Sequence, residues 1–233
     1  MTLFDGMWSG QSCLIVGGGP SLRGHEKRLA WAADTLLPKG GDGAERALGA
    51  CIAINRAFEF VNYPDIWLAA DSVYWRKKVP EELHEQARRN GVPRVWVDHG
   101  EKHPGQDKVD LVIPCAAPPG TPNRHAALAW GRSLAEGVGA GGNSGFAALN
   151  LADVLGAETV YLLGFDLRGE NGRTANWHDG YAEKPANESV YDRFLESFRW
   201  AAGKCRARVV VLEAKAGDSR LDCWEKRLAE EVL

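Results

Sequence analysis

Three consecutive glycines at the end of an apolar run are the first residues whose types could do chemistry. Gly17, Gly18 and Gly19 close the run, and Pro20 and Ser21 follow at once. Glycine lets a backbone approach a ligand with no Cβ in the way, and proline suits the first turn of a helix. Free N–H groups at a helix start, together with the serine hydroxyl, favour a phosphate. The alternative interpretation is a tight turn that binds nothing.

This turn differs from two nucleotide-binding motifs. Leu22 stands where the dinucleotide fingerprint GxGxxG has its third glycine, and no acidic residue ends the second apolar run. The lysine of the phosphate-binding P-loop is absent as well. The pattern therefore indicates an anion site without naming the nucleotide.

A second glycine-led turn places Asn143, Ser144 and Gly145 at the start of an amphipathic run over 143–155. Either Asn143 or Ser144 is a good N-cap. Ser144 then has two possible roles. It caps its helix and nothing more, or its hydroxyl and the neighbouring N–H groups meet a ligand phosphate or carboxylate.

Carboxylates end two of the apolar runs. Asp166 ends the run at 159–166, where a carboxylate is placed to hold a ribose hydroxyl or a metal ion. Asp71 ends the run at 65–71, and with Asp166 and Asp179 it could form an oxygen-ligand Mg²⁺ site. Alternatively, Asp71 caps the helix that follows it.

The polar segment after Asp166 contains the residue best suited to proton transfer. His178 lies in the stretch ANWHDGY, and histidine is the side chain most easily poised as a base near neutral pH. Trp177 and Tyr181 could stack on a sugar or base, or pin the loop. Arg168 could neutralise a phosphate. The alternative is that His178 and Arg168 are solvated surface residues.

The elements that must position these residues follow from the hydrophobic pattern. Short apolar runs alternate with longer amphipathic stretches, which predicts βαβ units. The apolar runs are continuous, as in strands covered on both faces. We expect one α/β domain over 1–233, a Rossmann-like three-layer fold whose mostly parallel sheet has helices on both faces. The predicted strands are 12–18, 50–55, 65–71, 94–99, 108–114, 159–166 and 207–213; the predicted helices are 20–33, 73–90, 143–155 and 188–203; 37–48 and 115–142 are expected to be mobile insertions, and 167–187 a long polar loop.

Composition narrows the class of protein. A formal net charge of −3 and a pI of about 6.1 give no electrostatic footprint for nucleic acid or an anionic membrane. No apolar stretch reaches the ~20 residues of a membrane span. The five cysteines are scattered, with no CxxC pair, which indicates a reducing compartment and no structural zinc. We therefore expect a cytoplasmic protein.

Three ordered motifs resemble a family of bacterial transferases. CLIVGGGPSL, AINRAFEF and NSGFAALNLADVLGAETVYLLGFDL are similar, in that order, to motifs of the lipooligosaccharide sialyltransferases. They also resemble domains of the archaeal 6-hydroxymethylpterin diphosphokinase-like type, and most nearly phage-encoded proteins of the same outline whose function is not settled. The resemblance covers roughly 12–62 and 139–180.

The resemblance implies specific contacts. Residues 17–21 would lie against the nucleotide phosphate, and Asn55 and Ser144 would contact the nucleotide. Asn55 could also simply cap the turn after its strand. His178 matches the histidine that deprotonates the acceptor hydroxyl in the sialyltransferases. Gly18 departs from the family, which has asparagine there, so one side-chain donor is missing and the donor's identity is open.

Three functions follow as expectations. The first is a nucleotide-dependent transferase, glycosyltransferase-like, whose co-substrate is a nucleotide or nucleotide-sugar and which has no tightly bound cofactor. The second is a Mg²⁺-dependent ATP pyrophosphokinase, with Asp71 and Asp166 holding the metal. The third is a phage nucleotide-binding accessory protein without catalysis. The sequence specifies neither the acceptor nor the oligomeric state.

Overall fold

A computed structural model describes residues 2–23, 49–61, 63–175 and 187–233. Its centre is an eight-stranded sheet in the order β10-β9-β6-β1-β2-β3-β4-β5, and every neighbouring pair in it is parallel. The expected fold class, a Rossmann-like α/β fold with a parallel sheet, is confirmed. The strands are β1 (Ser12–Val16), β2 (Ala50–Ile54), β3 (Ile66–Ala69), β4 (Arg94–Asp98), β5 (Leu111–Pro114), β6 (Thr159–Leu163), β9 (Arg208–Glu213) and β10 (Glu225–Leu228).

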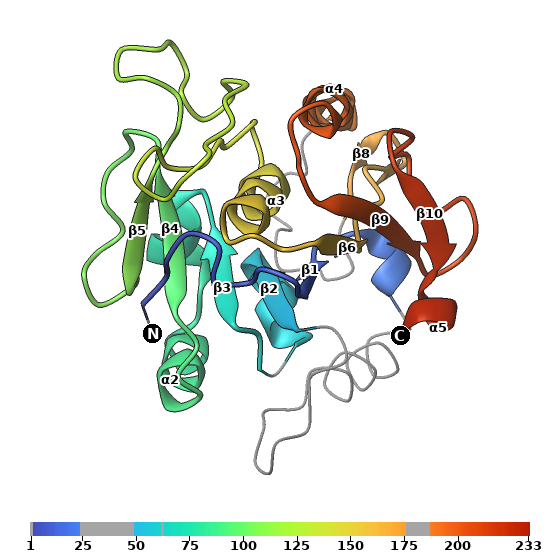
Figure 1. Ribbon diagram of the computed structural model, residues 1–233. Helices are drawn as coiled ribbons and strands as arrows, with labels where there is room; N and C mark the ends of the chain where they lie inside the picture. The colour runs from blue at the N-terminus through green and yellow to red at the C-terminus, as the bar shows by residue number, and fades with distance from the viewer. Residues whose placement is uncertain (1, 24–48, 62, 176–186) are drawn as a thin grey trace.

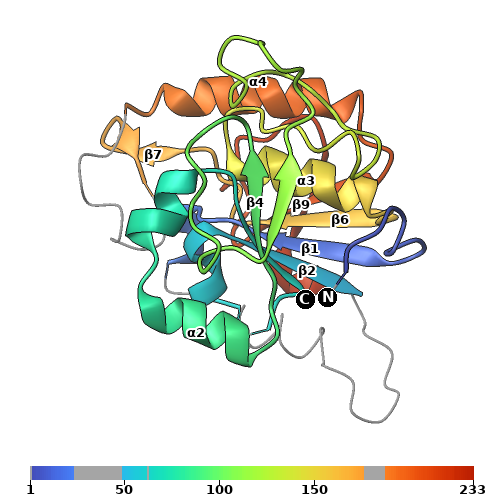
Figure 2. The same cartoon turned by 90° about the vertical axis from the view of Figure 1, so that its left-hand side faces the viewer.

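Helices cover both faces of the sheet, which makes three layers (Figures 1 and 2). On one face, α3 (Ser144–Val154) packs against the central strands and α4 (Val190–Ala202) packs on α3. On the other face lie the short helices η1 (Pro20–Leu22), η2 (Asn55–Glu59), η3 (Tyr74–Lys78), α2 (Glu81–Arg89) and α5 (Ala229–Val232).

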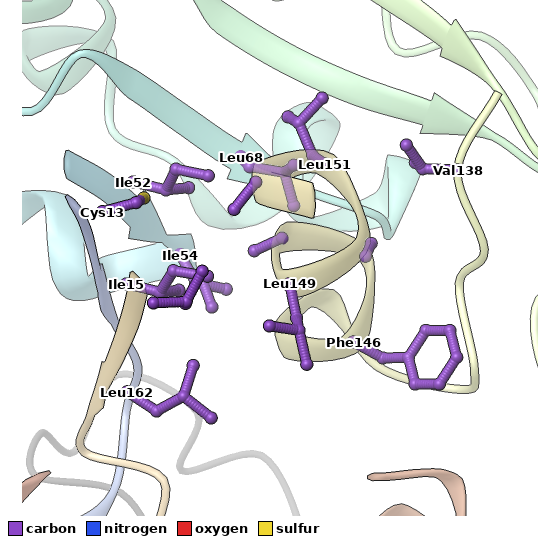
Figure 3. Packing of buried hydrophobic residues seen from close by; sticks show 14 of the residues in the cluster. Cys13, Ile15, Ile52, Ile54, Leu68, Val138, Phe146, Leu149, Leu151 and Leu162 are labelled. Carbon is purple, nitrogen blue, oxygen red and sulfur yellow. The ribbon is translucent and has the colours of Figure 1, made fainter. Parts of the chain in front are cut away.

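The strands contribute side chains to two separate hydrophobic cores, because successive side chains of a strand point to opposite faces of the sheet. Ile15 of β1 and Ile52 of β2 lie in the core beneath α3, whereas Leu14 lies in the core on the opposite face. Figure 3 shows Ile15 and Ile52 on the side of the sheet that faces α3. All residues of β2 are buried, which explains why these strands appear in the sequence as continuous apolar runs.

Helix α3 is the element that connects the core to the candidate site. All 11 of its residues are buried, because the sheet lies on one side and α4 on the other. A helix that is apolar all round belongs inside a fold rather than on its surface. Its start is held by Asn143, whose Oδ1 accepts the Phe146 N–H at 2.8 Å.

The prediction of one helix over 73–90 is wrong. The segment forms the π-helical turn η3 and then α2, with Pro80 between them at φ −60°, ψ 146°. Proline lacks the N–H that a helix interior needs and forces the preceding residue away from helical angles. Val79 is accordingly extended, at φ −94°, ψ 119°.

Other boundaries also differ from the expectations. Of the predicted helix 20–33 only the 3₁₀ turn η1 is described; the rest, like the insertion at 37–48, lies within 24–48, outside the described residues. The 167–187 loop carries a small ladder of β7 (Gly169–Glu170) and β8 (Arg173–Thr174). The charged C-terminal stretch forms β10 and α5, which the sequence analysis missed.

The segment 115–142 is irregular but tied to the fold, contrary to the expectation of a mobile insertion. Arg124 donates to the carbonyls of Cys115 and Ala117 at 3.0 Å each. From inside α3, Asn150 Oδ1 accepts the N–H groups of Gly131 and Gly139 at 2.9 and 2.8 Å. The buried amide thus fixes an apolar, glycine-rich segment against the helix.

Candidate functional site

The candidate site lies where the strand order reverses. From β1 the chain adds β2 to β5 in one direction, then returns to place β6 on the other side of β1. In open α/β sheets, ligands bind outside the carboxyl ends of the strands at such a point. A cavity of about 140 Å³ lies at this edge. The predicted site residues in its wall are Gly17, Gly18, Gly19, Pro20, Asn55, Asn143, Ser144, Gly145, Asp166 and Arg168.

The glycines of the first turn are required by close packing rather than by unusual backbone angles. A Cβ on Gly17 would lie 2.7 Å from the carbonyl oxygen of Gly164, at the end of β6. A Cβ on Gly19 would lie 2.6 Å from the carboxylate of Asp166. These glycines therefore allow the ends of β1 and β6 to meet closely.

Asp166 fills the space that Gly19 leaves. Its Oδ2 accepts the Ser21 N–H at 2.6 Å and its Oδ1 accepts the Ser21 hydroxyl at 2.7 Å. Burial raises the pKa of the Asp166 carboxyl, and the two hydrogen bonds from Ser21 act in the opposite direction. Ser21 thus contacts a carboxylate of its own chain, and it is not among the cavity-lining residues.

The start of α3 forms the second wall of the cavity. Ser144 does not cap its own helix; its Oγ accepts the buried Ala70 N–H at 3.0 Å and lies 3.5 Å from Asn55 Oδ1. A Cβ on Gly145 would lie 2.7 Å from the ring of Phe165. Both residues are therefore fixed by packing with the ends of β3 and β6.

Three backbone donors of the cavity wall are unpaired. The N–H groups of Gly18, Ser144 and Gly145 have no acceptor within the described part of the chain. N–H groups in the first turn of an α-helix point outward along the helix axis, where they favour a negative charge. The two from α3 belong to a helix of 11 residues, long enough to have a substantial dipole.

Three further residues mark this edge of the sheet. Asn55 has a left-handed φ of 51°, and its carbonyl accepts the Trp67 Nε1–H at 2.7 Å. Leu167 is also left-handed, at φ 49°, which is unusual for a residue of its kind. Arg168 is exposed, lines the cavity and has no ion-pair or hydrogen-bond partner among the residues described. It therefore supplies a positive charge at the cavity wall.

The structure does not bring Asp71 to this site. Asp71 Oδ1 accepts the Val73 N–H at 2.6 Å, the capping role expected as the alternative, and Asp71 does not line the cavity. β3 and β6 are three strand positions apart, roughly 14 Å at ~4.8 Å per strand. One ion cannot bridge carboxylates so placed. In the part of the chain that is described, no group of three or more His, Cys, Asp or Glu side chains could hold a metal ion.

Four of the predicted site residues lie in 176–186, outside the described residues: Trp177, His178, Asp179 and Tyr181.

The sequence analysis missed the aromatic part of the cavity wall. Helical spacing predicted α4 and its apolar face, but not that this face reaches the ends of β1 and β6. The missed lining residues are Phe165, Tyr191, Phe194 and Phe198.

Comparisons with known proteins give no relative. A scan against protein-family models and searches of the curated proteins and of the solved structures found no match. Among the described helices, none has both the length and the apolar character needed to cross a membrane.

Proposed function

We propose that this chain is a nucleotide-dependent transferase of the glycosyltransferase-like kind. One observation supports the proposal: the N–H groups of Gly18, Ser144 and Gly145, which have no acceptor among the described residues, line a cavity at the switch point of a parallel sheet, and Arg168 lines the same cavity. Backbone donors and an arginine in such a crevice favour phosphate. A cavity of about 140 Å³ suits a phosphate group better than a whole nucleotide, since complete ligand pockets measure ~300–1,000 Å³.

In this proposal the donor's phosphate is the leaving group. An acceptor hydroxyl attacks the donor carbon, the bond from that carbon to the phosphate oxygen breaks, and the electron pair leaves with the phosphate. The α3 N–H groups and Arg168 stabilise the charge that develops on this oxygen. The hydroxyl proton passes to a base, for which His178 remains the prediction.

The two alternatives differ in their support. The Mg²⁺-dependent pyrophosphokinase has less support, because Asp71 accepts the Val73 N–H and does not line the cavity that Asp166 lines. Noncatalytic nucleotide binding, as in a phage accessory protein, would use the same cavity. The five cysteines all lie in the described part of the chain, and none of them forms a disulfide bond.

The test is a thermal-shift screen with nucleoside mono-, di- and triphosphates and nucleotide-sugars, with and without Mg²⁺. A ligand at 100 times its Kd stabilises the fold by about 2.7 kcal/mol. We expect a metal-independent shift with one nucleoside family, weakened by Arg168→Ala and unchanged by Arg89→Ala, which removes an exposed arginine of α2. No shift with any compound would refute the proposal. A shift without turnover of any donor would favour the noncatalytic alternative.

A further inference from the structure

The feature that carries a further inference is the pairing of Ser21 with Asp166. Ser21 offers two donors on one side of the first glycine turn, and a single carboxylate takes both, at 2.6 and 2.7 Å. Asp166 is only 4% exposed. The absent Cβ of Gly19 leaves the space in which this carboxylate lies.

We propose that Asp166 is a specificity-determining residue that acts as the resident anion of the first glycine turn. A ligand phosphate and a carboxylate compete for the same donors, so Ser21 does not bind a ligand's anionic group while Asp166 is ionised and in place. That group is directed to Ser144 and Gly145 at the start of α3, and to Arg168. The carboxylate oxygens retain lone pairs for a hydroxyl or amino group of the ligand.

This inference rests on the proposed function in one respect, namely that the ligand entering the cavity carries an anionic group. It also reverses one expectation drawn from the resemblance, namely that residues 17–21 lie against the nucleotide phosphate. The part of the turn occupied by Ser21 and Asp166 recognises a neutral or cationic part of the ligand, whereas the Gly18 N–H stays available to the anionic group. This arrangement fixes the direction in which the ligand lies across the crevice.

Among the described residues, three charged or titratable groups act on Asp166. Arg168 follows it in the chain, Asp218 faces it from the connection between β9 and β10, and Tyr191 faces it from α4. Arg168 favours the ionised carboxyl and Asp218 opposes it. Protonation of Asp166 would remove the resident charge and leave the Ser21 donors available to an external anion.

Sulfate is the probe, because it is anionic throughout the relevant pH range and carries no base, sugar or transferable group. Calorimetric titrations at constant ionic strength compare the wild-type chain with Asp166→Asn, Ser21→Ala and the double variant. Asp218→Asn is the matched control, since it removes one neighbouring negative charge without freeing the Ser21 donors. Circular dichroism checks the fold of each variant.

We expect Asp166→Asn to bind sulfate about tenfold or more tightly than either the wild-type chain or Asp218→Asn, because the Ser21 donors then face a neutral amide oxygen, with which an external anion competes more successfully than with a carboxylate. The double variant should lose this gain, and Ser21→Ala alone should match the wild type. The inference is overturned if Asp166→Asn binds no more tightly than Asp218→Asn. It is also overturned if Ser21→Ala weakens sulfate binding to the chain with Asp166 intact.

A second measurement covers the case in which Asp166→Asn does not fold. Sulfate affinity of the wild-type chain should rise as the pH falls toward 4. It should rise less in Ser21→Ala, which has the same titrating groups as the wild-type chain. Equal increases in the two proteins would overturn the inference. Because sulfate is not a nucleotide, failure here leaves the nucleotide screen unaffected, and failure of that screen leaves this result unaffected.

Discussion

His84 links the stability of this fold to pH. It is fully buried on α2, where its ring packs against the rings of Trp67 and Trp75, and its Nδ1 lies 3.2 Å from Arg94 Nη1. Arginine can only donate, so Nδ1 accepts and the ring is neutral. Burial, then the positive charges of Lys108 and Arg94, lower the pKa of His84 to about 4 from an ordinary value of 6.5. A protonated His84 ring would place its Nδ1–H against an N–H donor of Arg94, and would bring two positive charges together.

The magnitude follows from linkage between protonation and folding. Below pH 6.5 the unfolded chain binds a proton at His84 that the folded chain rejects until about pH 4. The folded state is therefore progressively destabilised as the pH falls from 6.5 to about 4. Above pH 6.5, where His84 is neutral in both states, its protonation costs the folded state nothing. Each pKa unit is worth about 1.4 kcal/mol, so the loss from His84 alone amounts to about 3 kcal/mol.

Urea unfolding at several pH values between 7 and 4 measures this effect. His84→Gln keeps an oxygen that can accept from Arg94 and has no group that titrates in this range, so its free energy of unfolding should fall about 3 kcal/mol less than that of the wild type. His103→Gln, at an exposed position, is the control and should keep the wild-type slope. Parallel curves for His84→Gln and the wild type would refute the reasoning.

Two further predictions concern the start of α3. Ser144→Ala should lower the free energy of unfolding by about 1–3 kcal/mol in urea titrations, because the buried Ala70 N–H loses its acceptor; a change below 0.5 kcal/mol would contradict that role. Gly145→Ala should cost about 1–3 kcal/mol, seen as a lower Tm, because the new methyl group would lie 2.7 Å from the Phe165 ring. Gly203→Ala, whose Cβ would meet its nearest neighbour at 3.8 Å, should leave Tm nearly unchanged.

Local sequence patterns predicted those helices and strands that are determined by residues close together in the sequence. The apolar runs located β1 to β6 and β9, and the Asn143 cap placed the start of α3 within one residue. Pro80 is also a local signal, and it should have ended the helix predicted over 73–90. The charged run that forms β10 has no such signal, because an edge strand with exposed side chains need not be apolar.

The site was predictable in part for the same reason. Two glycine-led turns and a strand-end carboxylate indicated which segments would meet, and these segments do line one cavity. The pairing of Ser21 with Asp166 joins residues 145 positions apart and depends on the order in which strands are placed in the sheet. The same holds for the separation of Asp71 from Asp166, which local patterns do not encode.

The complete burial of α3 has a consequence for how ligand binding is detected. A helix enclosed between a sheet and a second helix exposes the hydrogen-bonded N–H groups beyond its first turn to solvent exchange only when the surrounding layers separate. A ligand bound at the first turn of α3 therefore stabilises the same layers that separate in global unfolding. We expect binding to slow hydrogen exchange at the most protected amides of β1, β6 and α3 together, rather than only at the loops that surround the cavity.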